Sequence, residues 1–87
     1  MHSVITVLGK DKTGIISTVS RVIAAHKANI LDISQTTMQK TFVMMMMIDV
    51  EENNYKSLRE DLQNEAKELQ MTINTYHEDV YNAMHRI

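Results

Sequence analysis

The residues best suited to bind a small solute lie in the turn Gly9-Lys10-Asp11-Lys12-Thr13-Gly14, between a β-branched apolar run and a helical one. Gly14 allows close approach to the backbone, and the N–H groups of Ile15 and Ile16 at the start of the following helix are expected to be free donors. A helix start of this kind favours a nearby anion by roughly 0.3–1 kcal/mol. Asp11 opposes a carboxylate but can hold an ammonium group, so an amino acid matches the set. These backbone donors do not by themselves supply a nucleophile or a base, which indicates binding rather than catalysis.

Each of these residues also has a purely structural explanation. Asp11 or Thr13 could cap the helix, and Gly14 could ease the turn. Asn29 is predicted to lie close to the turn once the first two strands share a sheet, where its amide would face the ligand. Asn also accepts the left-handed conformation that often follows a helix, so Asn29 could instead be a helix terminator. The residues alone allow both the ligand-binding and the structural interpretation.

Length and composition limit the range of functions. The 87 residues form one small domain, and the absence of cysteine excludes disulfides, thiolate zinc sites and cysteine nucleophiles. Nine basic and eleven acidic residues are spread along the chain without a basic block, so neither nucleic acid nor a membrane surface is an expected partner. The apolar run 42–48 is too short to span a bilayer, and residues 1–3 lack the start of a secretory signal. We therefore expect a cytoplasmic protein.

Methionine and histidine do not form a metal site in this pattern. In a strand, Met44 and Met46 point to one face and Met45 and Met47 to the other, so four thioethers cannot converge on one ion. Flexible packing in a core or interface explains them better. The histidines stand at positions 2, 26, 77 and 85 without a close ligand pair. No metal and no cofactor are expected.

Hydrophobic periodicity predicts a strand-helix-strand-strand-helix-strand order with a short helical tail. Two helices can bury their apolar stripes on one face of a four-stranded antiparallel sheet, and right-handed crossovers place the first and third strands in the middle. This is the ferredoxin-like α+β sandwich, here one domain over residues 1–87 with its core in 3–77. The predicted strands are Ser3–Leu8, Asn29–Met38, Phe42–Val50 and Met71–His77, the helices run from Gly14 to Lys27 and from Tyr55 to Leu69, and the tail helix covers 80–87.

Two sequence segments resemble an ACT domain, the amino-acid-sensing module of metabolic regulators. They are Asp11-Lys12-Thr13-Gly14-Ile15-Ile16 and Asn29-Ile30-Leu31-Asp32-Ile33, and the similarity extends from Ser3 to about His77. The methionine-rich third strand and the ending Tyr81-Asn82-Ala83-Met84-His85-Arg86-Ile87 are similar to a small bacterial family of stand-alone ACT proteins.

The resemblance implies that small ligands bind at interfaces between paired domains. Carried over position by position, it implicates five ligand-binding residues: Asp11, Gly14, Ile15, Asn29 and Asp32. Two positions depart from many relatives, because Thr13 stands where proline is common and Lys27 where glycine ends the first helix.

The function implied is a non-enzymatic regulatory domain. As a homodimer it would bind a small molecule, an amino acid by preference, and act on a partner protein in trans. The alternative is a protein-interaction or dimerisation module without a metabolite. An RNA-recognition domain shares the topology, but the chain has a single Phe, Phe42, inside an apolar strand. A small phosphate-binding hydrolase would need an arginine-rich first loop, which is missing.

Overall fold

The computed structural model describes residues 1–10 and 14–84. The tail residues 85–87 and the turn residues Asp11 and Thr13, which were predicted to bind or cap, lie outside this described part. Three helices and four strands follow one another in the predicted order. They are β1 (His2–Gly9), α1 (Ile15–Ala25), β2 (Asn29–Met38), β3 (Thr41–Asp49), α2 (Glu52–Leu69), β4 (Thr72–His77) and α3 (Glu78–Met84).

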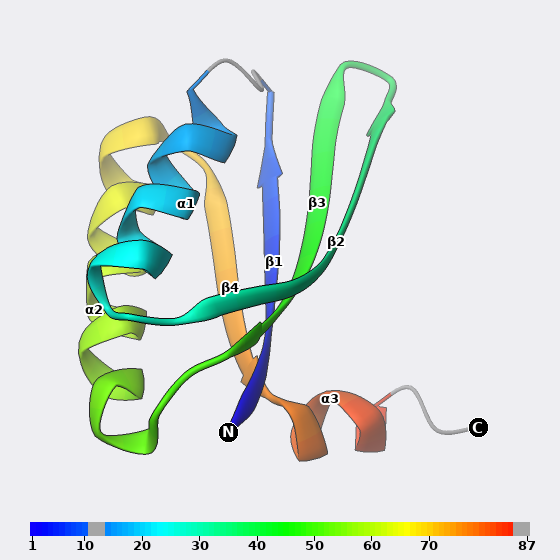
Figure 1. Cartoon of the computed structure of the whole chain (residues 1–87). Coiled ribbons are helices and arrows are strands. Elements are labelled where there is room, and N and C mark those ends of the chain that lie inside the picture. The colour runs from blue at the N-terminus through cyan, green and yellow to red at the C-terminus, as the bar shows by residue number, and fades with distance from the viewer. Residues whose placement is uncertain (11–13, 85–87) are drawn as a thin grey trace.

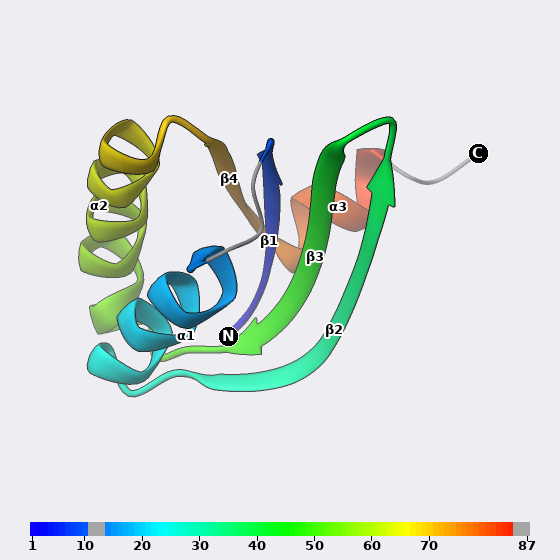
Figure 2. The same cartoon turned by 90° about the horizontal axis from the view of Figure 1, so that it is seen from above.

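The four strands form one antiparallel sheet in the order β2-β3-β1-β4. Helices α1 and α2 cover one face, and α3 lies on the opposite side of the sheet (Figures 1 and 2). The prediction of a ferredoxin-like sandwich is confirmed, with β1 and β3 in the centre. Their position explains why both strands carry apolar residues on both faces, whereas β2 and β4 are edges.

The core lies between the sheet and the two long helices. The inward residues Ile5, Met44 and Met46 of the central strands are fully buried, as are Leu58 and Leu62 on the inner stripe of α2. This alternation fixes the register of β1 and β3, because a slip of one residue would turn every core side chain outward. The register therefore fixes which residues lie at each end of the sheet.

Helix α1 ends differently from the prediction. Its last helical residue is Ala25, and Lys27, not Asn29, adopts the left-handed conformation, with φ 59°. The Lys27 N–H donates to the Ala24 carbonyl at 3.0 Å and the Ala28 N–H to the Ile23 carbonyl at 3.1 Å. These two bonds form a Schellman cap, a position that normally selects glycine. The terminator interpretation of Asn29 is therefore wrong, because Asn29 already begins β2.

Two irregularities shape the β2–β3 hairpin. The pairing register shifts between Ile30 and Asp32, so Leu31 is the extra residue of a β-bulge. Gln39 and Lys40 both have positive φ, 49° and 70°, and they link Met38 to Thr41 in a two-residue turn of type I′ geometry. The predicted tight turn at this pair is confirmed, although the pair lacks the Asn and Gly that such turns favour.

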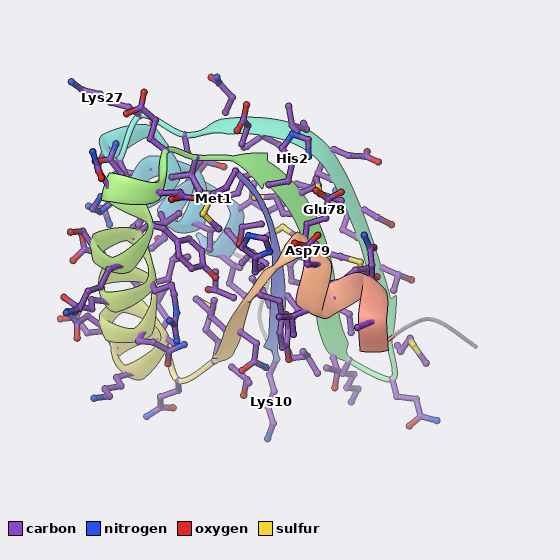
Figure 3. The ribbon with its side chains drawn as sticks, turned by 90° about the horizontal axis from the view of Figure 1, so that it is seen from below. Met1, His2, Lys10, Lys27, Glu78 and Asp79 are labelled. Carbon is purple, nitrogen blue, oxygen red and sulfur yellow. The ribbon has the colours of Figure 1, made fainter. Side chains whose placement is uncertain are left out.

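The tail helix begins earlier than expected. It starts at Glu78 immediately after β4 and runs to Met84. The His2 Nδ1 lies 3.0 Å from Glu78 Oε2, which holds the start of α3 against the first strand (Figure 3). Tyr81 is half-buried and Val80 is exposed. The side chain of Met84 and the whole of Ile87, which were expected to cover a surface with them, lie outside the described part.

Candidate ligand-binding site

The start of α1 has the backbone geometry expected of an anion site. Gly14 is the N-cap with φ 81°, a left-handed value that residues with a Cβ rarely adopt. A Cβ built on Gly14 would meet no described heavy atom within 4 Å. The first helical bond runs from the Thr18 N–H to the Gly14 carbonyl at 2.9 Å, which leaves the helix no partner for the N–H groups of Ile15 and Ile16. Since the Ile15 side chain is buried, that residue could contact a ligand only through its backbone.

A hollow of about 510 Å³ lies at the same end of the sheet. Gly9, Lys10 and Ile15 line one side of it, and Met71 and Thr72 line another. Gly9 permits the close packing there, because a Cβ at this position would come within 3.1 Å of Ile15 Cδ1 and 3.3 Å of Met71 Cβ. The hollow gives a solute access to the first turn of α1, and Lys10 is the one cationic side chain among its described lining residues.

Asn29 lies at the other end of the sheet, contrary to the prediction. It pairs with Asp49, which in turn pairs with His2 at the start of β1. Gly9 belongs to the opposite row, with Phe42. Between the two ends runs α1, whose 11 residues span about 16 Å at 1.5 Å each (Figure 1). The prediction of proximity overlooked the crossover: two strands joined by a helix across one face of a sheet run in the same direction, so the end of β1 and the start of β2 lie at opposite ends.

Asp32 is also separated from the Gly14 turn. It pairs with Met47, and Ser34 pairs with Met45, so both polar side chains of β2 lie on the sheet face away from α1 and α2. Asp32 Oδ1 accepts a bond from the Ile33 N–H at 2.9 Å. One chain thus brings Gly14 and Ile15 together, but neither Asn29 nor Asp32 joins them.

The methionine run behaves as predicted. Met44 and Met46 are fully buried under the helices, whereas Met45 is 37% exposed and Met47 half-buried on the other face. The three described histidines, His2, His26 and His77, each contact another part of the chain. His26 Nε2 lies 2.6 Å from Asp61 Oδ2 and so links the end of α1 to α2. Within residues 1–10 and 14–84, no three His, Asp or Glu side chains come together as metal ligands would.

The feature that sequence reasoning missed is the exposure of β2. All ten residues of this edge strand are exposed, and Ile30, Leu31 and Ile33 keep 42%, 51% and 43% of their surface open. On the described residues, β2 pairs only with β3, so the outer backbone groups of the strand face solvent. The imperfect alternation over 29–38 was the available signal, because a half-buried strand would alternate more cleanly. A long uncovered edge strand that exposes several large apolar side chains is uncommon in a monomer.

Comparison with known proteins identifies the class. A family model described as an ACT domain matches residues 2–76, which is the sheet and both long helices, so the chain belongs to the ACT-domain family. Such a domain is typically a small-molecule regulatory domain, and no enzyme family is indicated. None of the helices in the described residues is sufficiently long and apolar to cross a membrane.

The particular relatives are small proteins of nearly the same length. The chain is 46% identical to the UPF0237 protein MK1213 of Methanopyrus kandleri over 99% of this chain and 98% of that protein. It is 39% identical to the UPF0237 protein lin0537 of Listeria innocua over the whole of both chains.

Solved structures agree with the fold. An ACT domain protein from Streptococcus pneumoniae superposes with a TM-score of 0.82 at 36% identity, over 93% of each chain. A putative glycine cleavage system transcriptional repressor gives a TM-score of 0.79 at 26% identity over 85% of this chain and 43% of that one.

Proposed function

We propose that this chain is a cytoplasmic, non-enzymatic regulatory domain that works as a homodimer, binds an amino acid between its two subunits and thereby alters a partner protein. The observation that carries the proposal is the fully exposed edge strand β2. Pairing of two β2 strands would satisfy the outer backbone groups and cover the exposed Ile30, Leu31 and Ile33.

Antiparallel pairing of two β2 strands would also bring predicted site residues of the two subunits to the same end of the sheet. The end of β2 lies in the same row as Gly9, because Thr37 and Gly9 both pair with Phe42. In a two-fold pair the start of one β2 lies beside the end of the other. Asn29 of one subunit would then reach the end of the sheet where Gly14 of its partner begins α1. The ligand site is therefore proposed to be shared between the two chains.

The chemistry of this shared site matches an amino acid. The N–H groups of Ile15 and Ile16 would donate to the carboxylate, aided by the helix dipole. The side-chain amide of Asn29 from the other subunit can both donate and accept, and Asp11 would accept from the ammonium group. Asp32 is left out of this site, since its side chain lies on the far face of the sheet.

Regulation would follow from the position of the ligand. A solute held between subunits favours the arrangement of the dimer that binds it best, in proportion to its difference in affinity for the two arrangements. The exposed face of the dimer would carry this change to a partner protein in trans. A related fold in a putative transcriptional repressor supports a regulatory role but not a particular target.

A thermal-shift screen of the twenty amino acids, followed by calorimetry on each hit, tests the proposal. We expect saturable binding that Gly14→Ala and Asn29→Ala each weaken at least tenfold. The Asn29 change should leave the melting temperature nearly unchanged, because Lys27 and not Asn29 ends α1. Glu60→Gln, an exposed change on the outer side of α2, is the control and should bind normally.

Mixing the two defective variants distinguishes a shared site from one within a single chain. A heterodimer of Gly14→Ala and Asn29→Ala has one site with both native residues, so refolding the two together should restore normal affinity at one site in each heterodimer. If the mixture stays defective although heterodimers form, the shared site is excluded. If no amino acid binds to the native protein and a defined protein partner binds at β2 instead, the interaction-module alternative replaces the sensor.

A further inference from the structure

The sheet face away from α1 and α2 carries a second, smaller cavity of about 120 Å³, which the amino-acid site does not use. It is bounded by β2 on one side, by the central strands beneath and by α3 on the other side. The side chains that matter are Val4, Met45 and Met47 in the floor, Asp32 and Ser34 on β2, and Tyr81 on α3.

Helix α3 completes this cavity. The Tyr81 hydroxyl donates to Met45 Sδ at 3.2 Å, which fixes the ring beside the methionine surface. The other end of the helix is held by the contact of 3.0 Å between His2 Nδ1 and Glu78 Oε2 (Figure 3). Without α3 the same residues would form an open sheet surface rather than a cavity.

The polar groups of the cavity are concentrated on β2. The bulge at Leu31 shifts the register so that Asp32 pairs with Met47 and Ser34 with Met45, and both side chains therefore flank the methionine floor. Asp32 uses Oδ1 for the Ile33 N–H at 2.9 Å, but a carboxylate has about four acceptor positions in all. Among the described residues that line the cavity there is one carboxylate and no lysine, arginine or histidine.

We propose that this cavity binds a small alkylammonium cation. Its ammonium group would donate to the Asp32 carboxylate and the Ser34 hydroxyl, while its alkyl chain would pack on the polarisable side chains of Met45 and Met47. The cavity equals the volume of about four liquid waters, which fits a chain of roughly four or five non-hydrogen atoms. The site is complete within one subunit, so it goes beyond the proposed function and does not depend on it.

Titration with n-butylammonium chloride, followed by NMR of ¹³C-methyl methionine, tests this assignment. The signals of Met45 and Met47 should shift in a saturable way at millimolar concentration, since so small a ligand gains little binding energy. Those of Met44 and Met46, on the buried face of the same strand, should stay in place. The neutral analogue n-butanol should bind at least about fivefold more weakly, the factor expected for one partly exposed ion pair.

Two variants with the same change in charge complete the test. Asp32→Asn keeps the acceptor for the Ile33 N–H, so the fold should survive, but affinity for n-butylammonium should fall about fivefold. Glu60→Gln removes a carboxylate on α2, far from the cavity, and should have no effect. Unsaturable shifts, equal binding of n-butanol, or unchanged affinity in Asp32→Asn would each overturn the assignment. None of these outcomes bears on the amino-acid site, which is tested separately by amino-acid binding to the Gly14→Ala and Asn29→Ala variants.

Discussion

Replacement of Lys27 by glycine should stabilise the protein. Lys27 occupies the left-handed position of the cap after α1, at φ 59°, where a residue with a Cβ is strained by about 1–2 kcal/mol. Glycine removes that strain, but it loses about 0.5–1 kcal/mol more backbone entropy on folding. The net gain in the free energy of unfolding should be about 0.5–1 kcal/mol. In a domain of this size that raises Tm by roughly 2–8 °C.

Replacing Lys27 by glycine changes the backbone preference at this position and little else. The side chain points away from the protein (Figure 3) and has no ion pair with another described residue. Both cap bonds, at 3.0 and 3.1 Å, are made by backbone groups that glycine retains. The change therefore tests backbone conformation rather than a lost contact.

Thermal and urea unfolding followed by circular dichroism, at one fixed protein concentration, measure the effect. Lys56→Gly is the matched control, because the same substitution inside α2 should cost about 0.8–1 kcal/mol. Lys27→Ala removes the charge but keeps a Cβ and should gain nothing. The reasoning fails if Lys27→Gly lowers Tm, or if Lys27→Ala raises it as much.

Three further changes probe other parts of the fold. Replacing Gln39-Lys40 by Asn-Gly should raise the free energy of unfolding by about 1 kcal/mol in urea titrations, because both residues have positive φ; a loss of stability would contradict the turn geometry. Met46→Ala should cost about 2–5 kcal/mol and Met45→Ala much less, since only Met46 is fully buried, and equal costs would contradict the facing of the strand. Removal of residues 78–87 exposes Val4 and should lower Tm through a loss of about 2 kcal/mol, so an unchanged melting curve would mean that α3 covers nothing.

The sequence predicts the architecture well because its strong signals are physical ones. Residues apolar on both faces identified β1 and β3 as central. The spacing of three and four from Tyr55 to Leu69 identified α2, although the helix begins three residues earlier, at Glu52. The range of β2 was predicted as observed, Asn29–Met38. The face of each methionine also followed from simple alternation.

The candidate site was less predictable, for reasons that lie in long-range geometry. The predicted topology already implied that Asn29 lies in the row of His2 rather than that of Gly9, because β1 and β2 are joined by a crossover helix and run parallel; the predicted proximity of Asn29 to the turn did not follow from it. The left-handed conformation of Lys27 goes against the preference of lysine, so the only sequence signal for it was the resemblance, which places glycine at this position. The bulge at Leu31, which aims Asp32 at the far face, has no local sequence signature.

The pairing of β2 is the central claim, and sedimentation equilibrium of the native chain beside Ile33→Lys tests it most directly. Ile33 is exposed on the edge strand, and a lysine there should block strand pairing without disturbing the core. At micromolar concentration we predict a species of twice 10.0 kDa for the native chain and one of 10.0 kDa for the variant. A native chain that sediments only at 10.0 kDa, or a variant that remains fully dimeric, would contradict the account.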